Sequence, residues 1–123
     1  MYRSVILLLL LCGSALAHDM RPTYPTWSVS HIPDVKVTRM EIFNKRVDVD
    51  WYEIGVFDVN FKPIPFVSRY RVFKIPYLTQ VKFDVYVTEA NSIGAEYICS
   101  ISKLQASEDN RPMVSSKICS RFK

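Results

Sequence analysis

Two histidines, His18 and His31, are the side chains best suited to hold a metal ion in this chain. A chain that begins at His18 would offer an α-amine and an imidazole together, and His31 could add a second imidazole. Nitrogen donors of this kind suit Cu(II), so a copper-binding protein that uses N-terminal His18 is one hypothesis. We favour the simpler interpretation that cleavage happens to expose His18 and that His31-Ile32-Pro33 is a surface turn, because a sequence does not show coordination geometry.

No combination of residues indicates a catalytic site. The chain contains no Gly-x-Ser-x-Gly elbow, phosphate-binding loop, Cys-x-x-Cys pair or His-Glu-x-x-His motif. Asp48, Asp50 and Asp58 have the same parity in one predicted strand, and paired carboxylates can perform acid–base chemistry. On a solvated strand face, however, such charges mainly provide solubility. We therefore expect a protein that is not an enzyme and that needs no cofactor.

The first 17 residues have the composition of a cleaved export signal. Arg3 precedes the apolar run VILLLLLC at residues 5–12, and Ala15-Leu16-Ala17 fits the small-x-small cleavage rule. The run is far shorter than the roughly 20 residues of a membrane-spanning helix, so we expect no stable membrane span. A lipoprotein acylated at Cys12 is the alternative, which the bulky residue before that cysteine disfavours.

Removal of the signal would leave two cysteines, Cys99 and Cys119, and a net charge of +3. In an exported protein two cysteines predict a disulfide, and we expect Cys99 to be bonded to Cys119. The small positive charge is not typical of a nucleic-acid-binding protein. The expected location is therefore outside the cell or in the periplasm, with no nucleic-acid partner.

Basic and aromatic side chains are interleaved in the middle of the chain. The residues that we select as a partner-binding surface are Arg69, Tyr70, Arg71, Lys74 and Tyr77. Arginine and tyrosine are enriched at protein interfaces, so this surface would suit another protein. It would also suit acidic glycans or lipid head groups. The other alternative is a charged edge strand whose arginines only prevent pairing with other chains and whose aromatic residues belong to the core.

Most of the chain has the pattern of β-strands. Strict alternation of apolar and polar residues over 81–88 predicts a half-buried strand, and residues 97–104 predict another, joined by a hairpin or by a turn between two sheets. Over 46–61 the odd positions are mostly apolar, and we expect them to face the core with a bend near 53–55.

The remaining segments are predicted to complete one domain. Residues 18–33 contain three of the seven prolines and predict an extended arm, docked at an edge or free. Residues 34–43 predict a strand with a bulge near 38–39, and residues 66–75 predict an edge strand. The chain is therefore predicted to consist of a signal peptide (1–17), an arm (18–33) and a β-sandwich domain (34–123).

The segment Gly94-Ala95-Glu96-Tyr97-Ile98-Cys99 resembles the Tyr-x-Cys of the F strand in immunoglobulin domains. The resemblance covers six residues, and no cysteine lies over 35–51 to form the bridge between sheets that this family has. It supports the architecture only. The predicted fold is an all-β antiparallel sandwich of immunoglobulin-like architecture with about seven strands.

These features predict an exported, non-enzymatic interaction protein that binds another protein through a sandwich face or an edge strand. A carrier that holds a lipid or another apolar ligand between its two sheets is an alternative, because the predicted core is rich in aromatic residues. The copper-binding protein described above is the other alternative.

Overall fold

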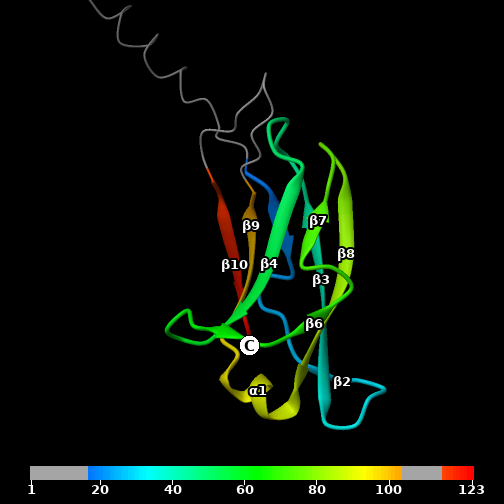
Figure 1. Ribbon diagram of the computed structural model, residues 1–123, viewed down its shortest axis with the longest axis vertical. Helices are drawn as coiled ribbons and strands as arrows, with labels where there is room; N and C mark the ends of the chain where they lie inside the picture. Colours follow the sequence, from blue (N-terminus) through cyan, green and yellow to red (C-terminus); the bar gives the residue numbers. More distant parts are fainter. Residues whose placement is uncertain (1–16, 104–114) are drawn as a thin grey trace, which may run out of the picture.

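The computed structural model describes residues 17–103 and 115–123, which form two antiparallel sheets packed against each other (Figure 1). The first sheet contains β1 (Asp19–Arg21), β2 (Ser28–Val29), β3 (Val35–Phe43), β6 (Val67–Ser68) and β8 (Gln80–Thr88). The second contains β4 (Trp51–Phe57), β5 (Pro63–Ile64), β7 (Val72–Lys74), β9 (Tyr97–Ser102) and β10 (Lys117–Arg121). The predicted all-β sandwich is confirmed.

The ladder between β3 and β8 is the centre of the first sheet. Its nine pairs run without interruption from Val35 opposite Thr88 to Phe43 opposite Gln80. In β8 the alternation gives the predicted result, because Phe83, Val85 and Val87 are buried in the core. The bulge predicted in β3 is wrong: its even-numbered residues face inward in one continuous register, and its two N-terminal valines lie on the other face.

In the second sheet, β4 buries the face opposite to the predicted one. Tyr52, Ile54 and Val56 are buried, whereas the odd-numbered residues are only partly covered. The predicted bend is also absent, since β4 pairs continuously with β9 from Tyr52 to Phe57. Apolar residues occupy both faces of β4, so the period-two pattern did not identify the inner face.

Residues 63–74 cross repeatedly from one sheet to the other. β5 pairs with β4, β6 pairs with β8, and β7 returns to β4. The single edge strand predicted over 66–75 is therefore wrong, because it is divided into two short strands in different sheets. Pro63 and Pro65 lack an amide donor, which restricts how far this segment can take part in a ladder.

The connection between β8 and β9 is the helix α1 (Glu89–Gly94), so the turn between two sheets is the correct alternative. Thr88 caps this helix, because its hydroxyl accepts a hydrogen bond from the Asn91 amide. Ala95 then enters the core, and the chain continues into the opposite sheet.

The arm over residues 18–33 is docked on the sandwich. β1 and β2 both pair with β3, and the Trp27 ring stacks on Phe122 at 4.4 Å between ring centroids. The arm also contacts the end of the chain: the amides of Arg121 and Lys123 donate to the carbonyls of Thr23 and Pro25 at 3.1 and 3.0 Å. These bonds close one side of the sandwich.

The predicted export signal lies outside the described residues except for Ala17, which is exposed. Within residues 17–103 and 115–123, no helix has both the length and the apolar character needed to cross a membrane.

Candidate functional site

The side of the sandwich opposite β1 and β10 has an unpaired strand edge. β8 pairs with β3 along its whole length, but on its other side β6 covers only Val85 and Tyr86. Among the described residues, no strand pairs with 80–84 on that side. β7 pairs with β4 alone, so its outer side is also free of a partner strand in this part of the chain. Both strands lie together at the right of Figure 1.

A groove with a volume of about 700 Å³ lies between these two edges. Its lining combines aromatic, aliphatic and charged side chains: Arg39, Trp51, Arg69, Tyr70, Val72, Phe73, Lys74, Val81, Lys82, Phe83, Asp84 and Tyr86. A concave surface beside an unpaired strand is suited to hold an extended segment of another chain.

Aromatic rings form the base of the groove. Phe73 and Phe83 are buried and lie 5.0 Å apart between centroids, and Tyr70 meets Phe73 edge-on at 5.8 Å. The two phenylalanines belong to opposite sheets, so their contact holds the two walls together. Tyr70 is 55% exposed and therefore offers its ring to solvent.

The charges around the groove are mostly positive. Arg39 makes two hydrogen bonds to the carboxylate of Asp84, at 2.9 and 3.2 Å, so these opposite charges offset each other. The Arg69 guanidinium lies 5.5 Å from the centre of the Tyr70 ring. Lys74 and Lys82 are exposed on the two walls. A groove of this kind favours an acidic ligand.

Three of the five residues predicted for partner binding come together here. Arg69, Tyr70 and Lys74 line the groove, whereas Arg71 stacks over Phe66 at 4.8 Å, and Tyr77 lies apart from it in the turn before β8. Arg69 and Arg71 both lie between β6 and β7 rather than within a strand, and only Arg69 lines the groove.

Sequence reasoning missed Arg39, Trp51 and Asp84 as members of this site. They come from three strands that are distant in sequence, and only the pairing of β3 with β8 brings Arg39 opposite Asp84. The one available signal was the alternation in β8, which turns Lys82 and Asp84 away from the core.

A second groove of about 510 Å³ lies near the other end of β8. Its lining is mainly apolar and includes Ile32, Pro65, Phe66 and Val67. His31 borders it and meets the ring of Tyr86 edge-on at 6.4 Å between centroids.

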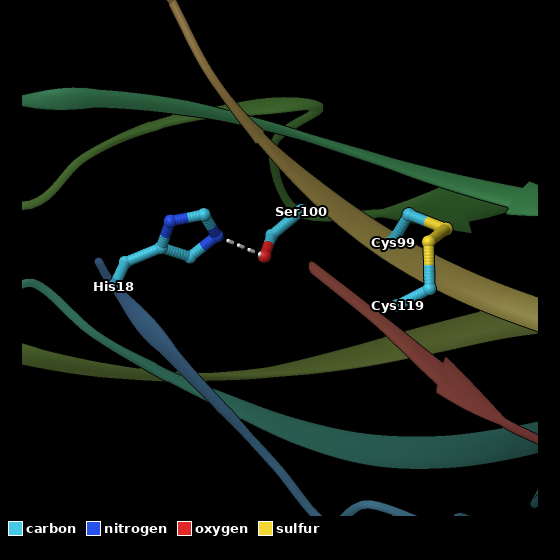
Figure 2. The surroundings of a disulfide bond; sticks show 4 residues. All are labelled: His18, Cys99, Ser100 and Cys119. Atoms are coloured by element: carbon cyan, nitrogen blue, oxygen red, sulfur yellow. Dashed lines mark hydrogen bonds between the residues drawn. A yellow bond between two sulfur atoms is a disulfide. The ribbon is translucent and has the colours of Figure 1, made fainter. Parts of the chain in front are cut away.

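His18 is buried, contrary to the expected surface position, with 3% of its surface exposed. Its Nε2 lies 2.7 Å from the Ser100 hydroxyl, and its Nδ1 lies 3.0 Å from the Ser116 hydroxyl. Figure 2 shows the imidazole directed at Ser100, one residue from the disulfide. Burial lowers the pKa of His18 to about 4, and the positive charge of Arg46 acts in the same direction.

The two histidines do not form a common site. His18 is held between Ser100 and Ser116, whereas His31 is exposed in the connection between β2 and β3. Within the described residues, no group of three or more histidine, cysteine, aspartate or glutamate side chains is arranged to hold a metal. The contact of His18 with Ser100 resembles a nucleophile and its base, but Ser100 is fully buried and beyond the reach of a substrate.

The three aspartates of the predicted strand have different surroundings. Asp48 accepts two hydrogen bonds from the Arg46 guanidinium, at 2.9 and 2.7 Å, which lowers the pKa of Asp48. Asp58 accepts from the amides of Asn60 and Lys62 and so shapes the turn after β4. Asp50 is exposed, and its carbonyl accepts a bond from Ile75. These roles are structural.

The sulfur atoms of Cys99 and Cys119 lie at bonding distance, 2.07 Å apart, as predicted (Figure 2). The two residues are directly opposite each other in the β9–β10 ladder. The bridge therefore joins neighbouring strands of one sheet, unlike the bridge between sheets of immunoglobulin domains.

Comparison of the sequence with models of known protein families found no match, and comparison with curated proteins found none either.

Proposed function

We propose that this chain is an exported, non-enzymatic binding protein that holds another protein along its β7–β8 edge. The observation that supports this most directly is that an unpaired strand edge and an aromatic, positively charged groove coincide. Unpaired strand edges readily accept a further strand, and arginine and tyrosine are enriched where proteins bind each other.

Two features support export. Residues 1–17 have the pattern of a cleaved signal, and the Cys99–Cys119 pair lies at bonding distance. Disulfides persist outside the cell and in the periplasm but are rare in the cytosol.

Charges near an exposed edge could instead serve only to prevent aggregation. The experiment that separates the two explanations is affinity capture from the extracellular or periplasmic fraction of the source organism, with the purified protein as bait. The bait variant Arg69→Glu/Lys82→Glu reverses two charges of the groove. The matched control, Lys62→Glu/Lys123→Glu, makes the same change in net charge at exposed positions outside it.

A specific partner should be recovered by the wild type and by the control, and recovery by the groove variant should fall about tenfold or more. Thermal melts of all three proteins check that the fold is unchanged, since exposed substitutions usually alter stability by less than about 0.5 kcal/mol. Equal recovery by the two double variants would reject the β7–β8 edge as the binding surface.

A second candidate function is the transport of an apolar ligand. The observation that favours it is the apolar lining of the second groove, which includes Ile32, Phe66 and Val67. The space between the sheets is occupied by buried side chains such as Tyr52, Ile42 and Ile98. A ligand there would require the sheets to separate. Mass spectrometry of an organic extract of the native protein would reveal a stoichiometric lipid if this function is correct.

A further inference from the structure

We infer that the partner enters the β7–β8 groove as an extended segment that pairs with residues 80–84 of β8 and alternates acidic with apolar side chains. This inference rests on the proposed function and adds the chemistry and the conformation of the bound segment.

The free edge of β8 has a defined length. β6 pairs with Val85 and Tyr86, and next to this pair the Ser68 hydroxyl donates to the Asp84 carbonyl at 2.9 Å. Apart from the Asp84 carbonyl, residues 80–84 therefore remain for a new strand, about 17 Å of edge at the usual rise of a strand. This length is typical of peptides that add to a sheet through main-chain hydrogen bonds.

The pleat of β8 determines which side chains the new strand presents. Phe83 is buried and Val81 partly so, whereas Lys82 is exposed on the opposite face. A strand paired with β8 has the same alternation, because paired strands share one pleat. Every second side chain would point toward the rings of Phe73 and Phe83, and the intervening ones would lie beside Lys82.

Charge selects acidic residues for the outward positions. Among the described residues, Asp84 already pairs with Arg39, but Arg69, Lys74 and Lys82 have no carboxylate within ion-pair distance. These three cations surround a groove that would exclude water once it is occupied. Carboxylates at the outward positions would lie beside Lys82 and form charge-assisted hydrogen bonds with it, whereas lysines there would be repelled.

A second copy of the same chain is a less suitable occupant. Two β8 edges paired across a two-fold axis would bring Lys82 of each copy to one short ladder, together with the cations of both grooves. Like charges near each other across strands are destabilising. Light scattering that showed a dimer for the wild type and a monomer for the variant Lys82→Glu would contradict the inference.

The test uses the disulfide-intact protein labelled with ¹⁵N and three peptides of about eight residues, long enough to cover the free edge. The first alternates Glu with Val and Tyr, and the second has Lys in place of every Glu. The third is the acidic peptide with N-methyl groups on alternate amides, which removes donors without altering charge. Binding is followed by shifts of the backbone amides in NMR titrations up to millimolar peptide.

The acidic peptide should shift the amides of residues 80–84 and 72–74, and the lysine and N-methylated peptides should bind about tenfold more weakly or worse. The protein variant Lys82→Glu should weaken the acidic peptide about fivefold or more, and the control Lys62→Glu should not. Equal binding of the three peptides, shifts confined to the second groove, or no shifts at all would overturn the inference.

If the acidic peptide does not bind preferentially, the proposed function is not affected by that result alone. A partner recovered by the control bait and lost by the groove variant, together with no preference for the acidic peptide, would leave the binding edge in place and reject the acidic strand. Loss of partner recovery with all baits would instead reject the proposed function.

Discussion

At the scale of single residues, the most unusual feature is an imidazole buried among hydroxyl groups. Serine hydroxyls can donate or accept, so Ser100 and Ser116 satisfy both ring nitrogens of neutral His18. Protonation would place a positive charge in a buried site near the Arg46 guanidinium. His18 therefore folds in its neutral form, which makes the stability of the protein depend on pH.

We expect stability to fall as the pH decreases from about 6.5 to 4. Because the pKa of His18 is lowered to about 4, the unfolded chain binds a proton in this range that the folded chain does not bind. The contribution of neutral His18 to the free energy of unfolding is fully present above pH 6.5 and is lost toward pH 4, a change of about 3 kcal/mol at most. The measurement is the free energy of unfolding in urea at a series of pH values.

The variant His18→Gln keeps hydrogen-bonding groups but cannot titrate, so its stability should decrease less over this range. His31→Gln is the control, since His31 is exposed, and it should follow the wild type. Parallel pH profiles for wild type and His18→Gln would contradict the role assigned to this imidazole.

Asn44 organises the loop before β4. It is fully buried: its amide donates to the carbonyls of Val49 and Ile75, and its Oδ1 accepts from the Tyr52 hydroxyl and the Arg46 amide. One side chain thus satisfies four polar groups that water cannot reach. The burial of the Tyr52 hydroxyl also raises its pKa to about 12.

We predict that Asn44→Ala lowers the free energy of unfolding by about 3 kcal/mol or more, because each buried group left without a partner costs roughly 1–3 kcal/mol. Urea denaturation measures the change. Asn60→Ala is the control, because Asn60 is exposed in a turn, and it should differ from the wild type by less than about 0.5 kcal/mol. A loss below about 1 kcal/mol for Asn44→Ala would contradict this role.

At the scale of elements, β4 illustrates how packing selects a face. Its inner residues are Tyr52, Ile54 and Val56, but its outer face is also apolar because the Phe57 ring lies over Gly55. Phe57 in turn contacts Lys117, whose ammonium lies 5.0 Å from the ring centre. Gly55 therefore provides room for a ring rather than the bend that the sequence suggested.

The two glycines of the described chain give a matched test. A Cβ added at Gly55 would lie 2.7 Å from Phe57 Cζ, whereas one added at Gly94 would have no heavy atom within 4 Å. Gly55→Ala should lower the free energy of unfolding by about 1 kcal/mol, because the end of the half-buried Phe57 ring must move. Gly94→Ala should raise the free energy of unfolding by about 0.4–1 kcal/mol. Gly94 does not have positive φ, so alanine fits its backbone and restricts the unfolded chain. Thermal melts that place the two variants in the opposite order would contradict this account.

The sequence predicted some elements well and others poorly for physical reasons. β8 was predicted correctly because one of its faces is core and the other is solvated, so its alternation is unambiguous. β4 and the segment 66–75 were not, because apolar side chains cover both faces of β4 and the short strands β6 and β7 belong to different sheets.

At the scale of the whole molecule, the sandwich architecture followed from repeated alternation and from the scarcity of helical patterns. The candidate site could be predicted only in part. Arg69, Tyr70 and Lys74 were near one another in the sequence, but Arg39 and Trp51 join them through pairings that depend on the complete topology. Long-range contacts of this kind leave no local pattern.

The bonds that close the terminal side of the sandwich have a mechanical consequence. The amides of Arg121 and Lys123 donate to the carbonyls of Thr23 and Pro25, in the same order along both segments. Residues 23–25 and 121–123 therefore run parallel to each other. A force that pulls His18 and Lys123 apart would therefore act along these segments and load their hydrogen bonds together, in shear, rather than one after another. Resistance to forced unfolding depends on the unfolding barrier rather than on equilibrium stability.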